Sequence, residues 1–221
     1  MPVSLYLASQ SPRRSQLLAQ IGVAHTLLLP DPADPHPDDT PEALEALEAV
    51  RPGEAADVYV QRVTLRKLQA AQARARRRSL AKDAAILCAD TTVALDGVIL
   101  GKPADAQEAA AVLRSLAGRR HAVLTAVAFA DGAAIRQALS VSQVDFAPLD
   151  QAWLAAYLAS GQWRGKAGSY GIQGLAGAMV ARIEGSYSGI MGLPLHETYQ
   201  LLRPWLADNA ACQPAHSEHF S

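Results

Sequence analysis

The chain has 221 residues, half of them apolar, and a formal net charge of −1. This length and apolar content suffice for a core in one domain, or in one domain with a lobe, while the near-zero charge argues against a protein that coats nucleic acid or a membrane and restricts any anion site to a small pocket. The chain has only two cysteines, Cys88 and Cys212, which favours a reducing compartment. It shows no basic-then-apolar leader and no apolar run near the roughly 20 residues that span a bilayer. We therefore expect a cytoplasmic protein.

The stretch LYLASQSPRR, residues 5–14, predicts a strand that runs directly into an anion-binding helix start. Ser11 followed by Pro12 is typical of an N-cap and a first helical residue, and a helix N-terminus offers unpaired N–H groups and a partial positive charge. Further donors surround that start: Ser9, Arg13 and Arg14. The stretch therefore predicts a polyphosphate pocket, although an ordinary capped helix with two solvated arginines explains it equally well in isolation.

The next segments are expected to be a helix that ends at Gly22 and a strand over residues 23–29. Residues 30–57 are rich in proline and acids and contain the local repeat EALEALEA. This composition predicts an exposed loop with one or two helical turns.

Helical spacing resumes over residues 58–79, where Lys67 falls within the apolar arc, about 20° from Val60 on a helical projection. Such a lysine either extends past the edge of the apolar stripe or points into a pocket, and we favour the pocket because lysine is seldom buried without a partner. The arginine-rich residues 74–78 are predicted to be a solvated helix end without a function.

Residues 85–100 consist of two apolar runs joined by an Asp-Gly dipeptide, which is typical of a tight hairpin. Asp90 interrupts the first run, and a buried carboxylate needs a cation, a metal or several donors to stay charged. Asp90 is therefore a candidate functional residue; the alternative is a β-bulge formed with the two threonines that follow it. Lys102, where the hairpin returns, is expected near Asp90 at the same end of the sheet.

The rest of the chain continues to alternate helices and strands. The expected elements are a helix over about 106–116 capped by Asp105, paired strands over 121–130 and 134–147, a helix over 151–160, and a last helix over 195–202 that ends near Pro204. Between the last two helices lies a glycine-rich stretch, which allows backbone to approach a ligand closely. The tail after residue 207, with His216 and His219, is expected to be frayed rather than metal-binding.

The sequence contains no complete copy of several familiar motifs of other enzyme classes. Residues 97–102 are one residue too short for a P-loop, and the glycines at 168, 171 and 174 do not have the spacing of a dinucleotide fingerprint. No HExxH or GxSxG occurs, so zinc peptidase and serine hydrolase activities have no sequence support.

Five blocks of the chain, LASQSPRR, CADTTV, LGKP, KAGSYGIQG and GSYSGIMGLPLHET, resemble in that order and spacing the Maf family of nucleoside triphosphate pyrophosphatases. The resemblance covers residues 3 to about 203. It implies an α/β fold, similar to that of inosine triphosphatase, in which a twisted mixed sheet with flanking helices forms two lobes around a nucleotide cleft. We therefore expect a single domain over residues 1–207 followed by an unordered tail over 208–221, and a homodimer that binds neither a nucleic acid polymer nor a membrane.

The resemblance also assigns roles to residues. Asp90 and Lys102 match catalytic positions, and the positions that match substrate-binding residues are Ser9, Arg13, Arg14, Lys67, Thr91 and Gln173. The implied cofactor is a divalent metal, Mg²⁺, Mn²⁺ or Co²⁺, held by Asp90 and by an acidic residue that follows the second strand. The chain is longer than the family there, and we assign this ligand to Asp34, with Glu42 as the alternative.

The implied reaction is metal-assisted attack of water on the α-phosphorus of a nucleoside triphosphate, which yields the monophosphate and pyrophosphate. A glutamine at position 173 can pair with the O4 acceptor and the N3–H donor of uracil or thymine, which predicts dTTP and UTP as substrates. A carboxylate would suit the two adjacent donors of guanine better. The alternatives are 7-methylguanosine triphosphate as the substrate, or a nucleotide-binding regulator of cell division with little turnover.

Overall fold

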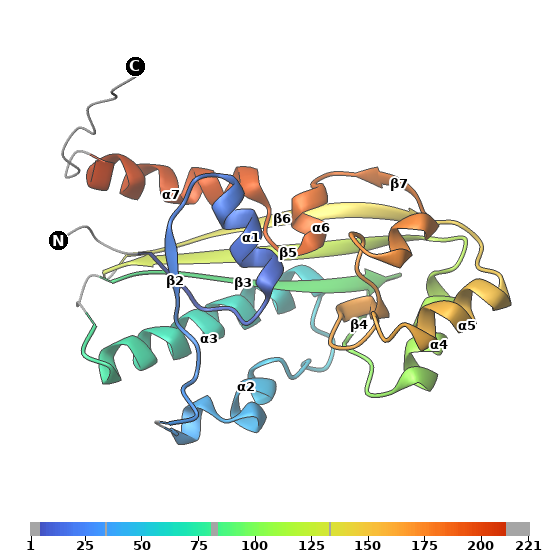
Figure 1. Cartoon of the computed structure of the whole chain (residues 1–221), viewed down its shortest axis with the longest axis horizontal. Coiled ribbons are helices and arrows are strands. Elements are labelled where there is room, and N and C mark those ends of the chain that lie inside the picture. Colours follow the sequence, from blue (N-terminus) through green and yellow to red (C-terminus); the bar gives the residue numbers. More distant parts are fainter. Residues whose placement is uncertain (1–4, 34, 81–83, 133, 211–221) are drawn as a thin grey trace, which may run out of the picture.

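The computed structural model describes residues 5–33, 35–80, 84–132 and 134–210. Helices and strands alternate along the chain, as Figure 1 shows, and η marks a 3₁₀ helix. Their bounds are β1 Leu5–Leu7, α1 Pro12–Gln20, β2 His25–Leu27, η1 Pro37–Asp39, α2 Pro41–Leu47, α3 Ala56–Arg77, β3 Ala85–Leu95, β4 Val98–Leu100, α4 Ala106–Leu116, β5 Arg120–Asp131, β6 Ala134–Phe146, α5 Gln151–Ala159, η2 Ala167–Ser169, η3 Leu175–Met179, β7 Val180–Glu184, α6 Tyr187–Met191 and α7 Leu195–Ala210.

The described residues form one mixed sheet of seven strands in the order β2-β1-β3-β5-β6-β7, with β4 paired to β3. β1 is parallel to both β2 and β3, and the remaining pairs are antiparallel. Helices flank this sheet, which confirms the expected α/β fold class. None of the helices in these ranges is long and apolar enough to cross a bilayer.

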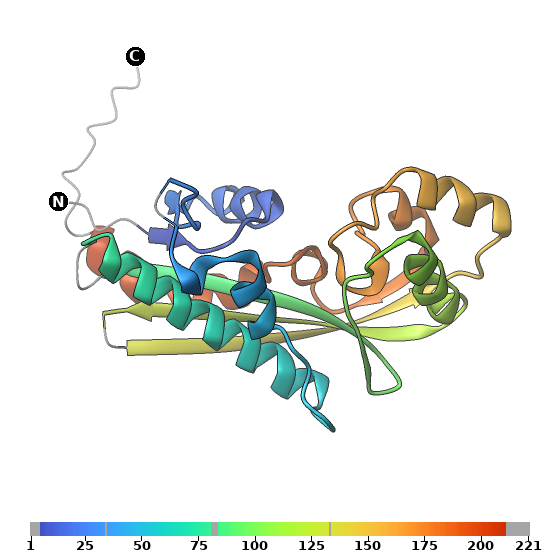
Figure 2. The same ribbon diagram turned by 90° about the horizontal axis from the view of Figure 1, so that it is seen from below.

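The two faces of β3 pack against different helices (Figures 1 and 2). Ala85, Leu87 and Ala89 belong to a buried cluster with apolar residues of α1 and α7. Ile86 and Cys88 belong to another cluster, in which they meet α3. Because side chains alternate along a strand, Asp90 lies on the α3 face.

A gap in the sheet leaves one edge of the middle of β3 without a paired strand among those described. β1 pairs only with residues 85–87 of β3, and β4 pairs only with residues 93–95. Residues 88–92 therefore have β5 on one side and none of the described strands on the other. In open sheets of this kind, ligands bind beyond the carboxyl ends of parallel strands, and the gap lies just beyond the carboxyl end of β1.

The strongest sequence patterns predicted their elements correctly. The Asp-Gly dipeptide forms the β3–β4 turn, where Asp96 and Gly97 have φ of 49° and 81°, and Asp105 caps α4 by accepting a hydrogen bond from the Glu108 N–H at 2.8 Å. The pairing of β3 with β5 is continuous from residue 86 to residue 94. The alternative of a β-bulge at Asp90 is therefore wrong.

The carboxyl-terminal elements differ from expectation. α7 continues through Pro204 to Ala210, because Leu202 and Trp205 are buried against the sheet and this packing offsets the proline. β7 and α6 lie within the stretch expected only to be glycine-rich. Residues 208–210 are thus helical, and the rest of the expected tail, with both histidines, lies outside the described residues.

The arginine-rich end of α3 is only partly solvated: Arg76 and Arg77 are exposed as expected, but Arg74 is buried. Arg74 is only 5% exposed; its guanidinium donates to both carboxylate oxygens of Asp39, at 2.6 and 3.1 Å, and to the Leu28 carbonyl at 3.0 Å. Arg77 also donates to Asp39, at 2.6 Å. The proline-rich segment between β2 and α3 is therefore attached to α3 by the buried Arg74–Asp39 ion pair and by the more exposed contact of Arg77, which no local pattern indicates.

Candidate active site

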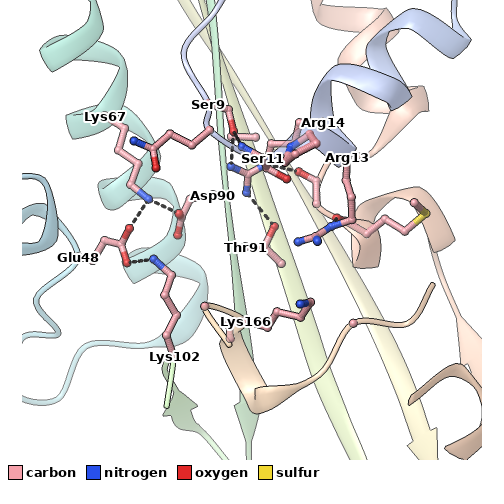
Figure 3. A pocket seen from close by; sticks show the side chains of 18 of the residues that line it. Ser9, Ser11, Arg13, Arg14, Glu48, Lys67, Asp90, Thr91, Lys102 and Lys166 are labelled. Carbon is pink, nitrogen blue, oxygen red and sulfur yellow. Dashed lines mark hydrogen bonds and ion pairs between the residues drawn. The ribbon is translucent and has the colours of Figure 1, made fainter. Parts of the chain in front are cut away.

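A pocket of about 440 Å³ opens at the gap in the sheet. Its walls come from the turn between β1 and α1, from α3, from the open edge of β3 and from residues 165–173 (Figure 3). Most of the sequence-predicted site residues line it: Ser9, Arg13, Arg14, Lys67, Asp90, Thr91, Lys102 and Gln173. Asp34 lies outside the described residues, and Glu42, on α2, is exposed and does not line this pocket.

Asp90 is held by a chain of ion pairs across the pocket. Lys67 Nζ lies 2.5 Å from Asp90 Oδ1 and 2.6 Å from Glu48 Oε1. Lys102 Nζ contacts the second oxygen of Glu48, also at 2.6 Å. The prediction that Lys67 points into a pocket is confirmed, and Lys102 joins Asp90 through Glu48 and Lys67 (Figure 3).

Burial and neighbouring charges act in opposite directions on the pKa values of Lys67 and Glu48, and in both the neighbouring charges and hydrogen bonds prevail. Burial by itself would lower the pKa of Lys67, but the carboxylates of Asp90 and Glu48 outweigh it and raise that pKa. Burial by itself would raise the pKa of Glu48, but the charges and hydrogen bonds of Lys67 and Lys102 lower it. Glu48 therefore stays ionised near neutral pH, beside Lys67 and Lys102.

Glu48 was missed by the sequence analysis, which considered other acids of the same segment. It follows α2 directly, and α3 fixes its backbone: the Tyr59 hydroxyl donates to the Glu48 carbonyl at 2.9 Å, and Arg62 donates to the Ala49 carbonyl at 2.9 Å. Arg62 also pairs with Glu54. In EALEALEA three glutamates recur at equal spacing, so nothing local distinguishes the last one.

Arg14 connects the start of α1 to the opposite wall. Its guanidinium donates to the Gly192 carbonyl at 2.7 Å, to Ser9 Oγ at 3.2 Å and to Thr91 Oγ1 at 3.3 Å. Burial lowers its pKa, and none of the described carboxylates lies within ion-pair distance. Ser11 occupies the N-cap position as expected, but its side chain makes no capping hydrogen bond.

Two further cationic side chains enter the pocket without an acidic partner in the described ranges. Arg13 makes one long hydrogen bond, from Nε to the Met191 carbonyl at 3.4 Å. Lys166, which the sequence analysis did not single out, is half-buried, and burial together with the charge of Arg13 lowers its pKa. Gln173 lies on the exposed rim of the same wall.

The acidic residues of the pocket fit a magnesium-type ion that shares its ligands with a phosphate substrate. Mg²⁺ is usually bound by one or two carboxylates and completes its coordination with waters and substrate phosphates. Asp90 and Glu48 present two carboxylates to one pocket, and the described residues contain no cluster of three or more acidic, histidine or cysteine side chains that would form a complete cage.

Comparisons with known proteins agree with this geometry. The family model for Maf-like protein matches residues 4–205. The dTTP/UTP pyrophosphatase of Cupriavidus metallidurans is 58% identical over 199 residues, which cover 90% of this chain and 95% of that protein. Proteins of the same name from Burkholderia lata and Polaromonas sp. are 57% and 55% identical over 90% of this chain and over 92% and 94% of their own lengths. The family resemblance seen in the sequence is confirmed, and the chain belongs to the Maf family.

Proposed function

We propose that this protein hydrolyses nucleoside triphosphates to the monophosphate and pyrophosphate, with dTTP and UTP as preferred substrates. The observation that carries the proposal is the composition of the pocket: Asp90 and Glu48 face one side of it, and three cations without acidic partners in the described ranges face the other. A triphosphate, with close to four negative charges near neutral pH, complements such a pocket. The names of the relatives support this choice of substrate.

In the proposed reaction, a water oxygen bonds to the α-phosphorus as the bond from that phosphorus to the α–β bridging oxygen breaks. The electron pair of the broken bond leaves with pyrophosphate, and the proton of the water passes to the Asp90 carboxylate, which orients the water. Lys67 holds the Asp90 carboxylate in place, since its Nζ lies 2.5 Å from Asp90 Oδ1. The arginines stabilise the negative charge that develops on the leaving group, and Lys102 faces the phosphates from the side of Asp90 and Glu48.

We assign a divalent cation to the same carboxylates, with Asp90 and Glu48 as its protein ligands in place of Asp34 and Glu42. Such an ion, Mg²⁺, Mn²⁺ or Co²⁺, supplies charge neutralisation for the phosphates and acidifies a bound water. Lys67 and Lys102 would balance the charge of these carboxylates beside the ion, since each lies 2.5–2.6 Å from a carboxylate oxygen.

Substrate choice is assigned to the Gln173 amide, together with Thr91 and Arg14 at the opposite wall. The amide presents one donor and one acceptor, which match the N3–H and O4 of thymine or uracil. A fully buried polar group left unpaired by the wrong base discriminates by roughly 10⁴ in favourable cases, and Gln173, at the exposed rim, is expected to discriminate less than that.

The test is a turnover panel with purified protein and Mg²⁺, Mn²⁺ or Co²⁺, in which dTTP, UTP, GTP and 7-methylguanosine triphosphate are compared. The expected result is release of pyrophosphate and monophosphate in equal amounts, fastest with dTTP and UTP. Faster turnover of 7-methylguanosine triphosphate would show that Gln173 does not select thymine and uracil by pairing with them. Binding without turnover under all three metals would instead favour a nucleotide-binding regulator.

We also propose that the active form is a homodimer, as the family resemblance implies, and that it acts in the cytoplasm, as the cysteine content favours. Sedimentation equilibrium over a range of concentrations measures the mass directly, and a monomer at all concentrations would contradict the proposal. The localisation can be checked by cell fractionation.

A further inference from the structure

The charges of the pocket are divided between two sides (Figure 3). On one side, Lys67 and Lys102 are balanced by Asp90 and Glu48. Across Asp90 and Thr91 in that view stand three cations that form no ion pair with any described residue: Arg13, Arg14 and Lys166. The second side therefore carries positive charge that an anionic ligand would neutralise, whereas the first side is already neutralised by its carboxylates.

The three cations differ in how many donors remain for a ligand. Each guanidinium nitrogen of Arg14 donates one N–H to a protein acceptor, so the main role of Arg14 is to hold the two walls of the pocket together. Arg13 donates one N–H, from Nε to the Met191 carbonyl at 3.4 Å. Lys166 Nζ has no hydrogen-bond partner among residues 5–33, 35–80, 84–132 and 134–210. Arg13 and Lys166 thus retain most of their donors.

The backbone places the Lys166 side chain with little freedom. Its aliphatic part lies over Gly171, where an added Cβ would be only 2.9 Å from Lys166 Cε. Holding this ammonium half-buried beside a second cation is unfavourable, as the lowered pKa of Lys166 shows. An anion between the two side chains removes both penalties, because it supplies hydrogen-bond acceptors and cancels the repulsion.

We infer that Lys166 and Arg13 form the subsite for the β- and γ-phosphates, so that the leaving pyrophosphate rests on this side of the pocket and the α-phosphorus lies at Asp90. The inference rests on the proposed function and deepens it. Lys166 donates hydrogen bonds to the phosphate oxygens as the electron pair of the broken bond moves onto pyrophosphate, and no proton transfer from Lys166 is required.

The experiment measures binding of inorganic pyrophosphate and of dTMP separately, by calorimetry with Mg²⁺, to the wild type and to Lys166→Met. Methionine keeps the aliphatic packing on Gly171 and removes the charge. A hydrogen bond between charged groups in such a site is worth roughly 10- to 100-fold in affinity, and we expect pyrophosphate to bind more weakly by that factor while dTMP binds as before.

The matched control is Arg164→Met. Arg164 lies two residues away, is exposed, stacks on Trp163 at 4.6 Å and does not line the pocket, so it loses the same charge from the same segment. This control should bind pyrophosphate as the wild type does. If Lys166→Met unfolds at a lower temperature than Arg164→Met, Lys166→Gln is measured in its place.

The outcomes separate the inference from the proposed function. Unchanged pyrophosphate affinity in both Lys166 variants overturns the subsite, and so does a loss of dTMP affinity equal to that of pyrophosphate, which would place Lys166 at the α-phosphate or the nucleoside. A wild type that binds pyrophosphate through Lys166 but releases none from dTTP or UTP supports the subsite and refutes the proposed hydrolysis.

Discussion

Replacing Lys67 by methionine tests the ion-pair chain on which the site depends. The variant leaves Asp90 and Glu48 facing each other without the cation that now lies 2.5 and 2.6 Å from them. The side chains of Lys67, Asp90 and Glu48 are 22%, 11% and 23% exposed. Their ion pairs are therefore closer to buried pairs than to surface pairs. Exposed pairs contribute about 0–1 kcal/mol, and breaking a buried pair costs about 3–5 kcal/mol.

An intermediate cost of about 2–3 kcal/mol in the free energy of unfolding is therefore expected at pH 7, which lowers Tm by roughly 5–10 °C for a chain of this size. The cost depends on pH. The folded-state pKa of Glu48 lies below its ordinary value, so the stabilisation is present above the unfolded carboxyl pKa of about 4.3 and is lost as pH falls through the folded pKa. The deficit of the variant should shrink between about pH 5 and pH 3.

The assay is thermal unfolding followed by circular dichroism, at several pH values, with EDTA or with Mg²⁺. Mg²⁺ should raise the Tm of Lys67→Met more than that of the wild type, because two carboxylates without a lysine bind the ion without competition. The matched control is Arg66→Met, the neighbouring position on α3, whose side chain has no hydrogen bond or ion pair with the described residues. A deficit equal to that of the control, or one that does not change with pH, would refute the reasoning.

Four further outcomes are expected. Asp90→Asn should lower kcat for dTTP by about 10²–10⁴-fold with its fold preserved and with a smaller loss of Tm than Lys67→Met, because Lys67 still pairs with Glu48; near-normal turnover would exclude Asp90 from the chemistry. Lys102→Met should lower kcat/KM for dTTP about tenfold, with a Tm change of at most a few degrees because its pair is 51% exposed on the lysine side; a large loss of Tm would mean a structural role instead. Gln173→Glu should reduce dTTP turnover relative to 7-methylguanosine triphosphate, and an unchanged ratio of kcat/KM values would show that Gln173 does not read the base. His121 is buried, which lowers its pKa to about 4, so stability should fall by up to about 3 kcal/mol as pH drops from about 6.5 to 4; denaturant titrations should show this slope in the wild type and lose most of it in His121→Gln.

The elements that the sequence predicted are those specified by neighbouring residues. The β3–β4 hairpin follows from an Asp-Gly dipeptide that tolerates positive φ, and the start of α4 follows from Asp105 three residues before Glu108. Asp90 could be selected from sequence because a carboxylate within an apolar strand needs a partner. The family resemblance extended this to further lining residues, such as Thr91 and Gln173, but not to Glu48 or Lys166.

Tertiary structure decided which charges meet. Glu48 is one of three equally spaced glutamates, and only the attachment of its segment to α3 through Tyr59 and Arg62 places it against Lys67 and Lys102. Lys166 lies far along the chain from Arg13, and no local spacing could pair them. Propensity and alternation are properties of a few consecutive residues, whereas the charge balance of a pocket depends on contacts between segments distant in sequence, which exist only once the sheet and its flanking helices have packed.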